Sequence, residues 1–262
     1  MKLIFLGDIV GKGGREAVKA LVPELRREYN AQFVVVNGEN SAAGNGITAS
    51  CARELLSVAD VITCGDHVWD QKGFDRDIDL FAQIVRPANL HPSQPGKGWN
   101  VFRNPAGGEI AVISLQGKVF MRDSACDPFI TVDEILKKIP ASVKNIIVDF
   151  HAEATSEKLA MGYFLNGRVT AVFGTHTHVQ TADAAILDGG TAYITDAGMC
   201  GGAVSVLGRE VPDVLHKFTT GMPNRLNVVE KGDIRLCGAV VTFDHLTGKA
   251  LNIELLNRIF TV

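Results

Sequence analysis

Short apolar segments rich in valine and isoleucine alternate with amphipathic segments along the first two thirds of the chain. Apolar runs of this length are typical of buried strands, and apolar residues at helical spacing are typical of helices that cover a sheet. The alternation therefore predicts parallel strands joined by helices. The expected strands are Lys2–Leu6, Phe33–Val36, Val61–Cys64, Asn145–Phe150 and Val169–Phe173. The expected helices are Arg15–Glu28, Thr48–Ser57 with Thr48 as the N-cap, Asp75–Ala82, Val132–Ile139 and Ser156–Phe164.

Glycine-rich and proline-rich segments interrupt this alternation. The segment Gly11–Gly14 predicts a turn, and Pro87–Gly98 predicts an exposed loop. The segment Asn104–Gly108 separates the apolar runs Asn100–Phe102 and Ile110–Ser114, which predicts a β-hairpin. Further strands are expected at Ala184–Leu187, Thr191–Ile194, Ile234–Phe243 and Ala250–Leu256. Parallel strands followed by antiparallel pairs predict an α/β fold in which two packed mixed sheets are flanked by helices.

The composition excludes several classes of protein. The chain has 262 residues, 46% of them hydrophobic, with a net charge of −3 and a pI near 6.2. This hydrophobicity excludes a disordered chain, and without a basic excess we expect no strong nucleic-acid binding. Asp8 interrupts the apolar N-terminal run, which argues against a signal peptide, and no apolar stretch approaches the roughly 18 residues of a membrane span. We therefore expect a cytoplasmic protein without a membrane partner.

The cysteines give no sign of a disulfide framework. Their number, five, is odd, and no two of them form a Cys-x-x-Cys pair. This pattern also argues against a zinc knuckle. We expect most of them to be small buried apolar side chains, and they are Cys51, Cys64, Cys126, Cys200 and Cys237.

Side chains that can bind metal ions follow several of the predicted strands. The carboxyl ends of parallel strands meet at one edge of a sheet, where ligands bind. We therefore expect three carboxylates and four histidines to lie together there. The motifs are Gly7-Asp8, Gly38-Glu39-Asn40, Gly65-Asp66-His67, Phe150-His151-Ala152-Glu153 and Gly174-Thr175-His176-Thr177-His178.

Each motif taken singly also has a structural explanation. A Gly-Asp pair after a strand is common, Glu39-Asn40 could cap a helix, and His67 or His151 could be a structural histidine. Four of the seven histidines follow strands, however, and this coincidence favours a metal site. The remaining histidines, assigned to the surface, are His91, His216 and His245.

The ligand types indicate which metals would bind. Carboxylates mixed with imidazoles suit Mn, Fe, Zn or Co better than Ca. His176 and His178 are two residues apart, so in an extended chain both side chains point to the same side. One imidazole could then serve each of two neighbouring ions.

The ordered motifs resemble the signature of the calcineurin-like metallophosphoesterases, and in particular their bacterial YmdB-type branch. The resemblance covers essentially the whole chain. It includes the segments Asn37–Ala42, Leu115–Met121, Thr195–Met199, Val206–Gly208 and Thr247–Ala250.

This resemblance implies a four-layer α/β sandwich, one domain spanning residues 1–262, and two bound metal ions. Iron and manganese are the expected metals, with zinc and cobalt as alternatives. The resemblance assigns Asp8, Glu39, Asn40 and His178 to one ion. It assigns Glu39, Asp66, His151 and His176 to the other, so that Glu39 bridges the two.

The resemblance also implies a phosphodiesterase acting on small-molecule cyclic nucleotides, including 2′,3′-cyclic ones, with 3′,5′-cyclic mononucleotides left open. Two neighbouring ions could present a bridging hydroxide to phosphorus. His67 would then protonate the departing ribose oxygen. Asp66 departs from the family pattern, which has Asn before this histidine. Because a carboxylate adds negative charge and loses the amide donor, we expect tighter metal binding and lower turnover.

Two other functions remain open. One is a metal-dependent phosphomonoesterase or protein phosphatase of the same superfamily, and the other is a metal-binding regulatory module with weak catalysis, which Asp66 would favour. Phe120, Phe129 and the expected loop at Gly198–Gly202 are candidates for lining the substrate cleft, although core packing explains the two aromatic residues equally well. The nucleobase preference and a homo-oligomeric state are left open.

Overall fold

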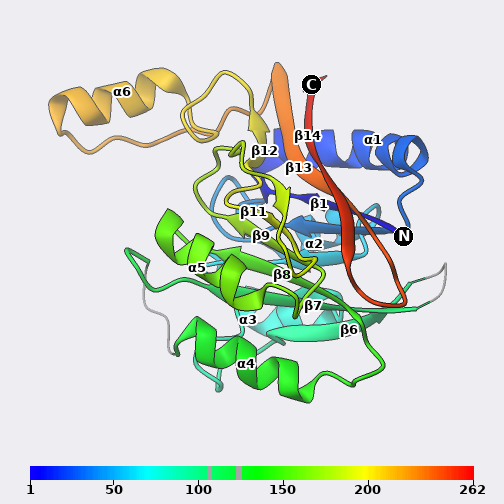
Figure 1. The fold of residues 1–262 in the computed structure, drawn as a ribbon. Coiled ribbons are helices and arrows are strands. Elements are labelled where there is room, and N and C mark those ends of the chain that lie inside the picture. The colour runs from blue at the N-terminus through cyan, green and yellow to red at the C-terminus, as the bar shows by residue number, and fades with distance from the viewer. Residues whose placement is uncertain (105–107, 122–125) are drawn as a thin grey trace.

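Two β-sheets pack face to face between two layers of helices (Figure 1). The structure is a computed structural model that describes residues 1–104, 108–121 and 126–262. The predicted α/β fold, with two packed mixed sheets flanked by helices in four layers, is confirmed.

The larger sheet carries the first part of the chain and its C-terminal strands. Its order is β2-β12-β13-β1-β3-β4-β5, and β14 pairs with β13 outside this path. The neighbours β1, β3, β4 and β5 are parallel, whereas β13 is antiparallel to β1 and β14. The strands are β1 (Lys2–Leu6), β2 (Asp8–Ile9), β3 (Phe33–Asn37), β4 (Val61–Thr63), β5 (Ile84–Val85), β12 (Met199–Gly202), β13 (Asp233–Phe243) and β14 (Ala250–Thr261).

The smaller sheet is built from the middle of the chain, in the order β10-β11-β9-β8-β7-β6. Its central strands β7, β8, β9 and β11 are parallel, and an antiparallel strand lies at each edge. The β6–β7 pair confirms the predicted hairpin, although residues 105–107 of its connection lie outside the described residues. The strands are β6 (Trp99–Arg103), β7 (Glu109–Gln116), β8 (Asn145–His151), β9 (Ala171–Thr175), β10 (Ala185–Ile186) and β11 (Ala192–Ile194).

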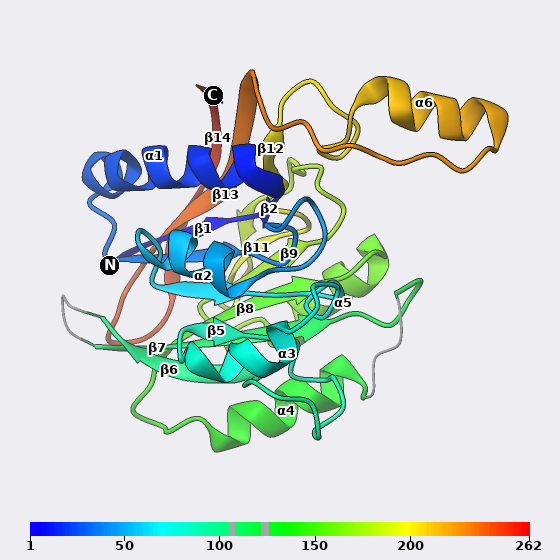
Figure 2. The same ribbon diagram turned by 180° about the vertical axis from the view of Figure 1, so that it is seen from behind.

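Helices cover the outer faces of both sheets. Helices α1 and α2 pack on the larger sheet, and α4 and α5 pack on the smaller one. Helix α6 instead projects away from both sheets, as the front and back views show (Figures 1 and 2). The described part of the chain includes no helix long and apolar enough to cross a membrane. The helices are α1 (Gly11–Tyr29), α2 (Ala49–Leu56), α3 (Phe74–Asp77), the 3₁₀ helix η1 (Ile78–Leu80), α4 (Pro128–Lys138), α5 (Thr155–Leu165) and α6 (Val211–Thr220).

Successive side chains of an inner strand point to opposite faces of its sheet, so they pack into two separate hydrophobic cores. In β1, Ile4 and Leu6 pack toward the helices of the larger sheet, whereas Leu3 and Phe5 pack between the sheets. The ring of Phe5 stacks on that of Phe173 in β9, with centroids 4.2 Å apart and planes 5° apart. This contact joins the two sheets directly.

The predicted turn at Gly11–Gly14 is wrong, because α1 begins at Gly11. The glycines serve close packing instead. A Cβ atom on Gly14 would lie 2.2 Å from the carbonyl oxygen of Cys200 in β12. Side chains in this first turn would therefore push the helix off the sheet.

Several other boundaries differ from the expectations. The helix expected at Asp75–Ala82 is split between α3 and η1, and the sequence pattern missed β2, β5, β12 and α6. The segment Gly198–Gly202 lies largely in the buried strand β12, not in a loop. The N-cap at Thr48 is confirmed, since its hydroxyl accepts a hydrogen bond from the Cys51 amide at 3.2 Å. Four of the five cysteines are buried, and Cys126 is exposed.

Removing the aromatic contact between the sheets should destabilise the fold. We expect Phe5→Ala to lower the free energy of unfolding by about 3–5 kcal/mol, because a fully buried ring is replaced by a cavity. Urea unfolding monitored by circular dichroism measures the change. Leu251→Ala, on an exposed side chain of β14, serves as the control and should change stability by less than about 0.5 kcal/mol. A loss below about 1 kcal/mol for Phe5→Ala would contradict this account of the core.

Candidate metal centre

The predicted site residues lie together where the carboxyl ends of strands from both sheets meet. The larger sheet contributes residues after β1, β3 and β4, and the smaller sheet contributes residues at the ends of β8 and β9. The site therefore belongs to both sheets, whereas the sequence pattern predicted a single sheet edge. Its residues are Asp8, Glu39, Asn40, Asp66, His67, His151, His176 and His178.

Four of these residues form a compact group of potential metal ligands. One donor atom from each of Glu39, Asp66, His151 and His176 lies within 4.8 Å of the others. The Nε2 atom of His151 is 2.9 Å from Glu39 Oε1, 3.1 Å from Asp66 Oδ1 and 3.0 Å from His176 Nδ1. A ring nitrogen carries at most one proton, which cannot serve three partners. Such convergence is typical of a metal site.

A buried hydrogen-bond chain orients the His151 ring. Thr175 Oγ1 lies 2.6 Å from Asp149 Oδ1 and donates its proton to that carboxylate. The same hydroxyl oxygen therefore accepts the Nδ1 proton of His151 at 2.9 Å. With Nδ1 protonated, the neutral form of His151, which is the form that binds a metal, would turn its Nε2 lone pair toward the group. Burial raises the pKa of Asp149 to about 6.

A second set of donors lies beside the first and shares Glu39. Asn40 Nδ2 is 3.2 Å from Glu39 Oε1 and 3.3 Å from His178 Nε2. His178 Nε2 is in turn 3.8 Å from Asp8 Oδ1. A half-turn of the Asn40 amide would present its oxygen, the metal-binding atom, at the same place. Asp8, Asn40 and His178 therefore form a second donor group, which contacts Glu39 through Asn40.

The electrostatics of the site favour a bound cation. Burial opposes the charged form of His151, but Glu39 and Asp66 outweigh this effect and raise its pKa well above the usual value. Burial likewise opposes ionisation of Asp8, yet His178 and His151 lower its pKa. Asp8 Oδ1 is buried without a hydrogen-bond partner among the described residues. An orphaned carboxylate oxygen among imidazoles and further carboxylates fits a metal ion well.

The glycine before Asp66 is required by the side chains around it. A Cβ atom on Gly65 would lie 2.3 Å from Glu39 Oε2 and 2.3 Å from His151 Cδ2. Any larger residue would displace two members of the donor group. The glycine thus permits close approach of the backbone to the site.

The loop that carries His176 and His178 is not extended, so that part of the prediction is wrong. His176 has φ of 99° and His178 has φ of 64°, both in the left-handed region that non-glycine residues disfavour. Even so, the two imidazoles reach different donor groups, His176 beside His151 and His178 beside Asn40. This unfavourable backbone needs support from its surroundings.

A buried ion pair supplies that support. Lys158 Nζ donates to Asp196 Oδ2 at 2.7 Å, and both side chains are 1% exposed. The same carboxylate oxygen accepts hydrogen bonds from the Thr177 amide at 3.1 Å and the Thr177 hydroxyl at 2.7 Å. Thr177 lies between the two histidines, so the ion pair fixes the loop at its centre.

His67 lies at the edge of the donor groups with its own carboxylate partner. Its Nδ1 is 2.7 Å from Asp70 Oδ2, and its backbone amide donates to Glu39 Oε2 at 3.1 Å. The side chain lines a cavity of about 380 Å³ that also contacts His176 and His178. His67 is therefore oriented by Asp70 and open to a ligand in this cavity.

Sequence reasoning did not single out the residues that support the site. Asp149 carried a signal, since it is two positions before His151 in an apolar strand and so shares its face. Asp70, three residues after His67, carried another. Lys158 and Asp196 come together through tertiary folding, which spacing along the chain does not reveal.

The aromatic residues proposed to line the cleft lie elsewhere. Phe120 is 88% exposed, and Phe129 packs edge-on against Phe164 at 5.4 Å between centroids. Neither lines the cavity beside His67. The three histidines assigned to the surface, His91, His216 and His245, are exposed as predicted.

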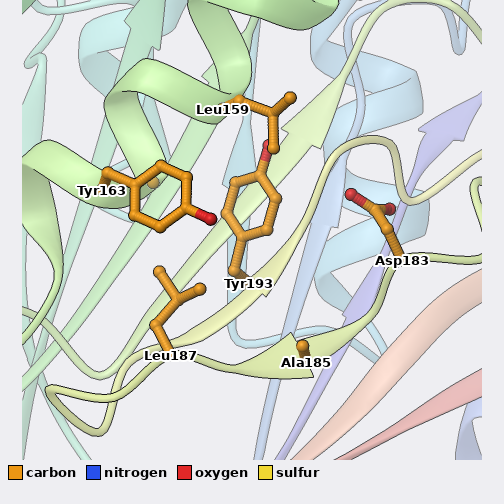
Figure 3. A pocket seen from close by; sticks show the side chains of 7 residues that line it. Leu159, Tyr163, Asp183, Ala185, Leu187 and Tyr193 are labelled. Atoms are coloured by element: carbon orange, nitrogen blue, oxygen red, sulfur yellow. The ribbon is translucent and has the colours of Figure 1, made fainter.

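A smaller cavity, of about 190 Å³, lies between α5 and the β10–β11 edge of the smaller sheet. Figure 3 shows Tyr163 and Leu187 on one side of the Tyr193 ring and Asp183 on the other. Asp183 already accepts hydrogen bonds from the hydroxyl groups of Thr181 and Thr195. The described residues that line this cavity therefore do not form a group of potential metal ligands like the one around His151.

The two packed mixed sheets, with carboxylates and histidines gathered at their shared end, define a metallophosphoesterase fold. Within that class, a family model described as YmdB-like protein matches residues 4–256, and the chain belongs to this family.

Comparison with known proteins gives the same assignment. The chain is 46% identical to a Bacillus subtilis protein named 2′,3′-cyclic-nucleotide 2′-phosphodiesterase, over 97% of this chain and 96% of the relative. A solved structure described as a novel phosphatase from Mycoplasma pneumoniae superposes with a TM-score of 0.91 at 35% identity, covering 99% of this chain and 93% of the other. A hypothetical protein from Thermus thermophilus has the same TM-score, 0.91, at 35% identity, with 99% of each chain covered.

The ion pair beneath the histidine loop should be energetically coupled. Lys158→Met leaves Asp196 buried without its counter-charge, so we expect a loss of about 3–5 kcal/mol in the free energy of unfolding, measured by urea denaturation. Adding Asp196→Asn should recover part of this loss, by about 1–3 kcal/mol relative to the sum of the single variants. Lys138→Met, on the exposed surface of α4, is the matched control and should be nearly neutral. Strict additivity of the two changes would show that the pair is not coupled.

Proposed function

We propose that this protein is a metal-dependent phosphodiesterase that hydrolyses 2′,3′-cyclic nucleotides. The observation that carries the proposal is the pair of donor groups that share Glu39, next to the His67–Asp70 pair in one cavity. Membership of the YmdB-like family and the name of the Bacillus subtilis relative support the substrate class. 3′,5′-Cyclic mononucleotides are a second candidate substrate.

We propose two metal ions, iron or manganese, with zinc or cobalt as alternatives. Glu39, Asp66, His151 and His176 would hold one ion, and Asp8, Asn40 and His178 would hold the other together with Glu39. When bound, such ions neutralise phosphate charge and lower the pKa of water, which supplies hydroxide at neutral pH. The protein itself provides the oriented ligands and a cavity in which they meet the substrate.

His67 is the proposed general acid. Hydroxide from water attacks phosphorus, the bond from phosphorus to the ribose O2′ breaks, and O2′ takes the proton from His67. The Asp70 carboxylate, 2.7 Å from Nδ1, holds the ring in place, which leaves Nε2 as the nitrogen available to a ligand in the cavity. The product would be a nucleoside 3′-phosphate, in keeping with the 2′-phosphodiesterase name of the relative.

Asp66 supports a second candidate, a metal-binding regulatory protein with weak catalysis. Its carboxylate lies 3.1 Å from His151 Nε2 and 3.5 Å from His176 Nδ1, inside the donor group. This second carboxylate of the donor group, the third of the site when Asp8 is counted, would hold cations tightly and reduce their ability to polarise phosphate. Turnover measured with added Mn²⁺ separates this candidate from an efficient enzyme.

The proposed function is tested by metal analysis together with product identification. We expect about two transition-metal ions per chain and conversion of 2′,3′-cyclic AMP to 3′-AMP, identified by phosphorus NMR. The simple phosphomonoester 4-nitrophenyl phosphate should react more slowly. Faster hydrolysis of that monoester would favour a phosphomonoesterase, and metal binding without turnover of either compound would favour the regulatory protein.

His67→Gln should separate catalysis from metal binding. Because Gln cannot act as a general acid, we expect turnover of 2′,3′-cyclic AMP to fall by about 10²–10⁴-fold. Metal content, measured by mass spectrometry, should stay unchanged because the His67 ring is not assigned to either donor group. His91→Gln, which alters an exposed histidine, should leave both quantities as they are. Loss of metal in His67→Gln would contradict the assignment.

Asp66→Asn restores the residue that the family pattern has before the histidine. Since the change removes one negative charge from the donor group, we expect weaker Mn²⁺ binding, by about tenfold or more, and higher turnover at saturating metal. Calorimetric titration of the metal-free protein measures the affinity, and steady-state kinetics measures the turnover. If both quantities matched those of the unaltered protein, the proposed role of Asp66 would be wrong.

A further inference from the structure

The cavity beside the metal-centre residues has two chemically different walls. One wall carries His67, Glu153 and His176, next to the proposed metal ligands. The volume of about 380 Å³ lies within the range of about 300–1,000 Å³ for small-molecule pockets. The other wall is largely apolar, and the hydrolytic chemistry gives it no role. Its residues are Val206, Leu207, Val214, Phe218 and Leu226.

This apolar wall comes from the segment that projects from the two sheets. We call residues 206–226, which include α6, the arm (Figures 1 and 2). Within α6, Val214 is buried, whereas Phe218 is 76% exposed although it lines the cavity. A phenyl ring in a substrate cavity with most of its surface uncovered is available to a planar partner.

Arg209 fixes the arm to the part of the chain that carries Glu39 and Asn40. Its guanidinium donates to the Gly44 carbonyl at 2.8 Å and to the Leu226 carbonyl at 3.1 Å. It also donates to the side chain of Asn45. These bonds join both ends of the arm to the loop after β3, so the apolar wall is held in place relative to the donor groups.

We propose that the ring of Phe218 stacks on the nucleobase of the substrate, while Val214 and Leu226 cover the remainder of the base. This inference rests on the proposed function, because it assigns the base of the cyclic nucleotide to the apolar wall and its phosphate to the metal-centre residues. The cavity is continuous between the two walls, as one molecule with a charged end and a flat apolar end requires. Stacking tolerates every base and is strongest for purines, so we expect a preference for purine cyclic nucleotides.

The neighbouring residues of the arm supply a matched control. Leu215 is 53% exposed on the same helix, but it does not line the cavity. Truncating Leu215 therefore tests the effect of removing an apolar side chain from α6 without touching the substrate. Phe218→Tyr preserves an aromatic ring and serves as the conservative variant.

The test compares a substrate that has a base with one that lacks it. For Phe218→Ala we expect KM for 2′,3′-cyclic AMP to rise about tenfold, with kcat within about twofold, since a stacking contact is lost and the reacting groups are unchanged. KM for the base-free analogue methyl riboside 2′,3′-cyclic phosphate should not change. Phe218→Tyr keeps a ring that can stack and should reverse most of the rise in KM caused by Phe218→Ala. Leu215→Ala should resemble the unaltered protein with both substrates.

Other outcomes would overturn the proposal in distinguishable ways. If Phe218→Ala raised KM equally for both substrates, Phe218 would shape the cavity in general and would not contact the base. If KM and kcat were unchanged but the mass of the particle measured by light scattering differed from that of the unaltered protein, the arm would be an interface between copies of the chain. If the unaltered protein hydrolyses neither substrate, the proposed function fails. Adenosine binding, measured by NMR titration, then tests the stacking separately: weaker binding by Phe218→Ala supports it, and equal binding rejects it.

Discussion

The carboxylate of Asp149 joins the two sheets at the end where the metal-centre residues gather. From the larger sheet it accepts hydrogen bonds from Asn37 Nδ2 at 3.0 Å and from the Thr63 hydroxyl. From its own sheet it accepts the Thr175 hydroxyl at 2.6 Å, which in turn holds the Nδ1 proton of His151. Since the donor groups draw residues from both sheets, their geometry depends on how the sheets are placed against each other. The stacked rings of Phe5 and Phe173 fix the distance between the layers, and Asp149 fixes their relation beside the site.

A second buried charge, on Asp196, supports the backbone of the loop that carries His176 and His178. The backbone at His176 and His178 adopts left-handed conformations that cost free energy, and the ordinary alternative, an extended loop, would direct the imidazoles elsewhere. Asp196 compensates through its bonds to Thr177, and Lys158 neutralises it in a place without solvent. A buried ion pair contributes little net stability compared with apolar packing. Its value here is geometric, because it supplies the directed hydrogen bonds that apolar side chains cannot make.

The sequence predicted the layers and the gathering of residues because both follow from periodicity. Strands such as Phe33–Val36 carry continuous apolar runs, and the motifs after them must meet wherever parallel strands end together. Periodicity could not show that the strands before Asp66 and before His151 belong to different sheets, since pairing between strands is a tertiary property. It also misjudged Gly11–Gly14, where glycine permits close packing of a helix and does not mark a turn. The sequence pattern did not predict the helix of the arm, because α6 does not cover a sheet. Val214 is the buried residue of α6, so the helix lacks the broad apolar face of a helix that packs on a sheet.

The negative charges at the site determine the order in which cations and a phosphate could bind to it. Asp8, Glu39 and Asp66 bring three carboxylates together, and Glu153 Oε2 lies 3.3 Å from His176 Nε2 at the cavity wall. A phosphodiester anion entering this cavity would be repelled, and partial burial makes the repulsion stronger than it would be in water. Under the proposed function, cations would have to occupy the donor groups before a phosphate could be held there. Asp66, a carboxylate where the resemblance implies an amide, would increase this dependence, because it adds negative charge within the donor group without adding a hydrogen-bond donor for phosphate.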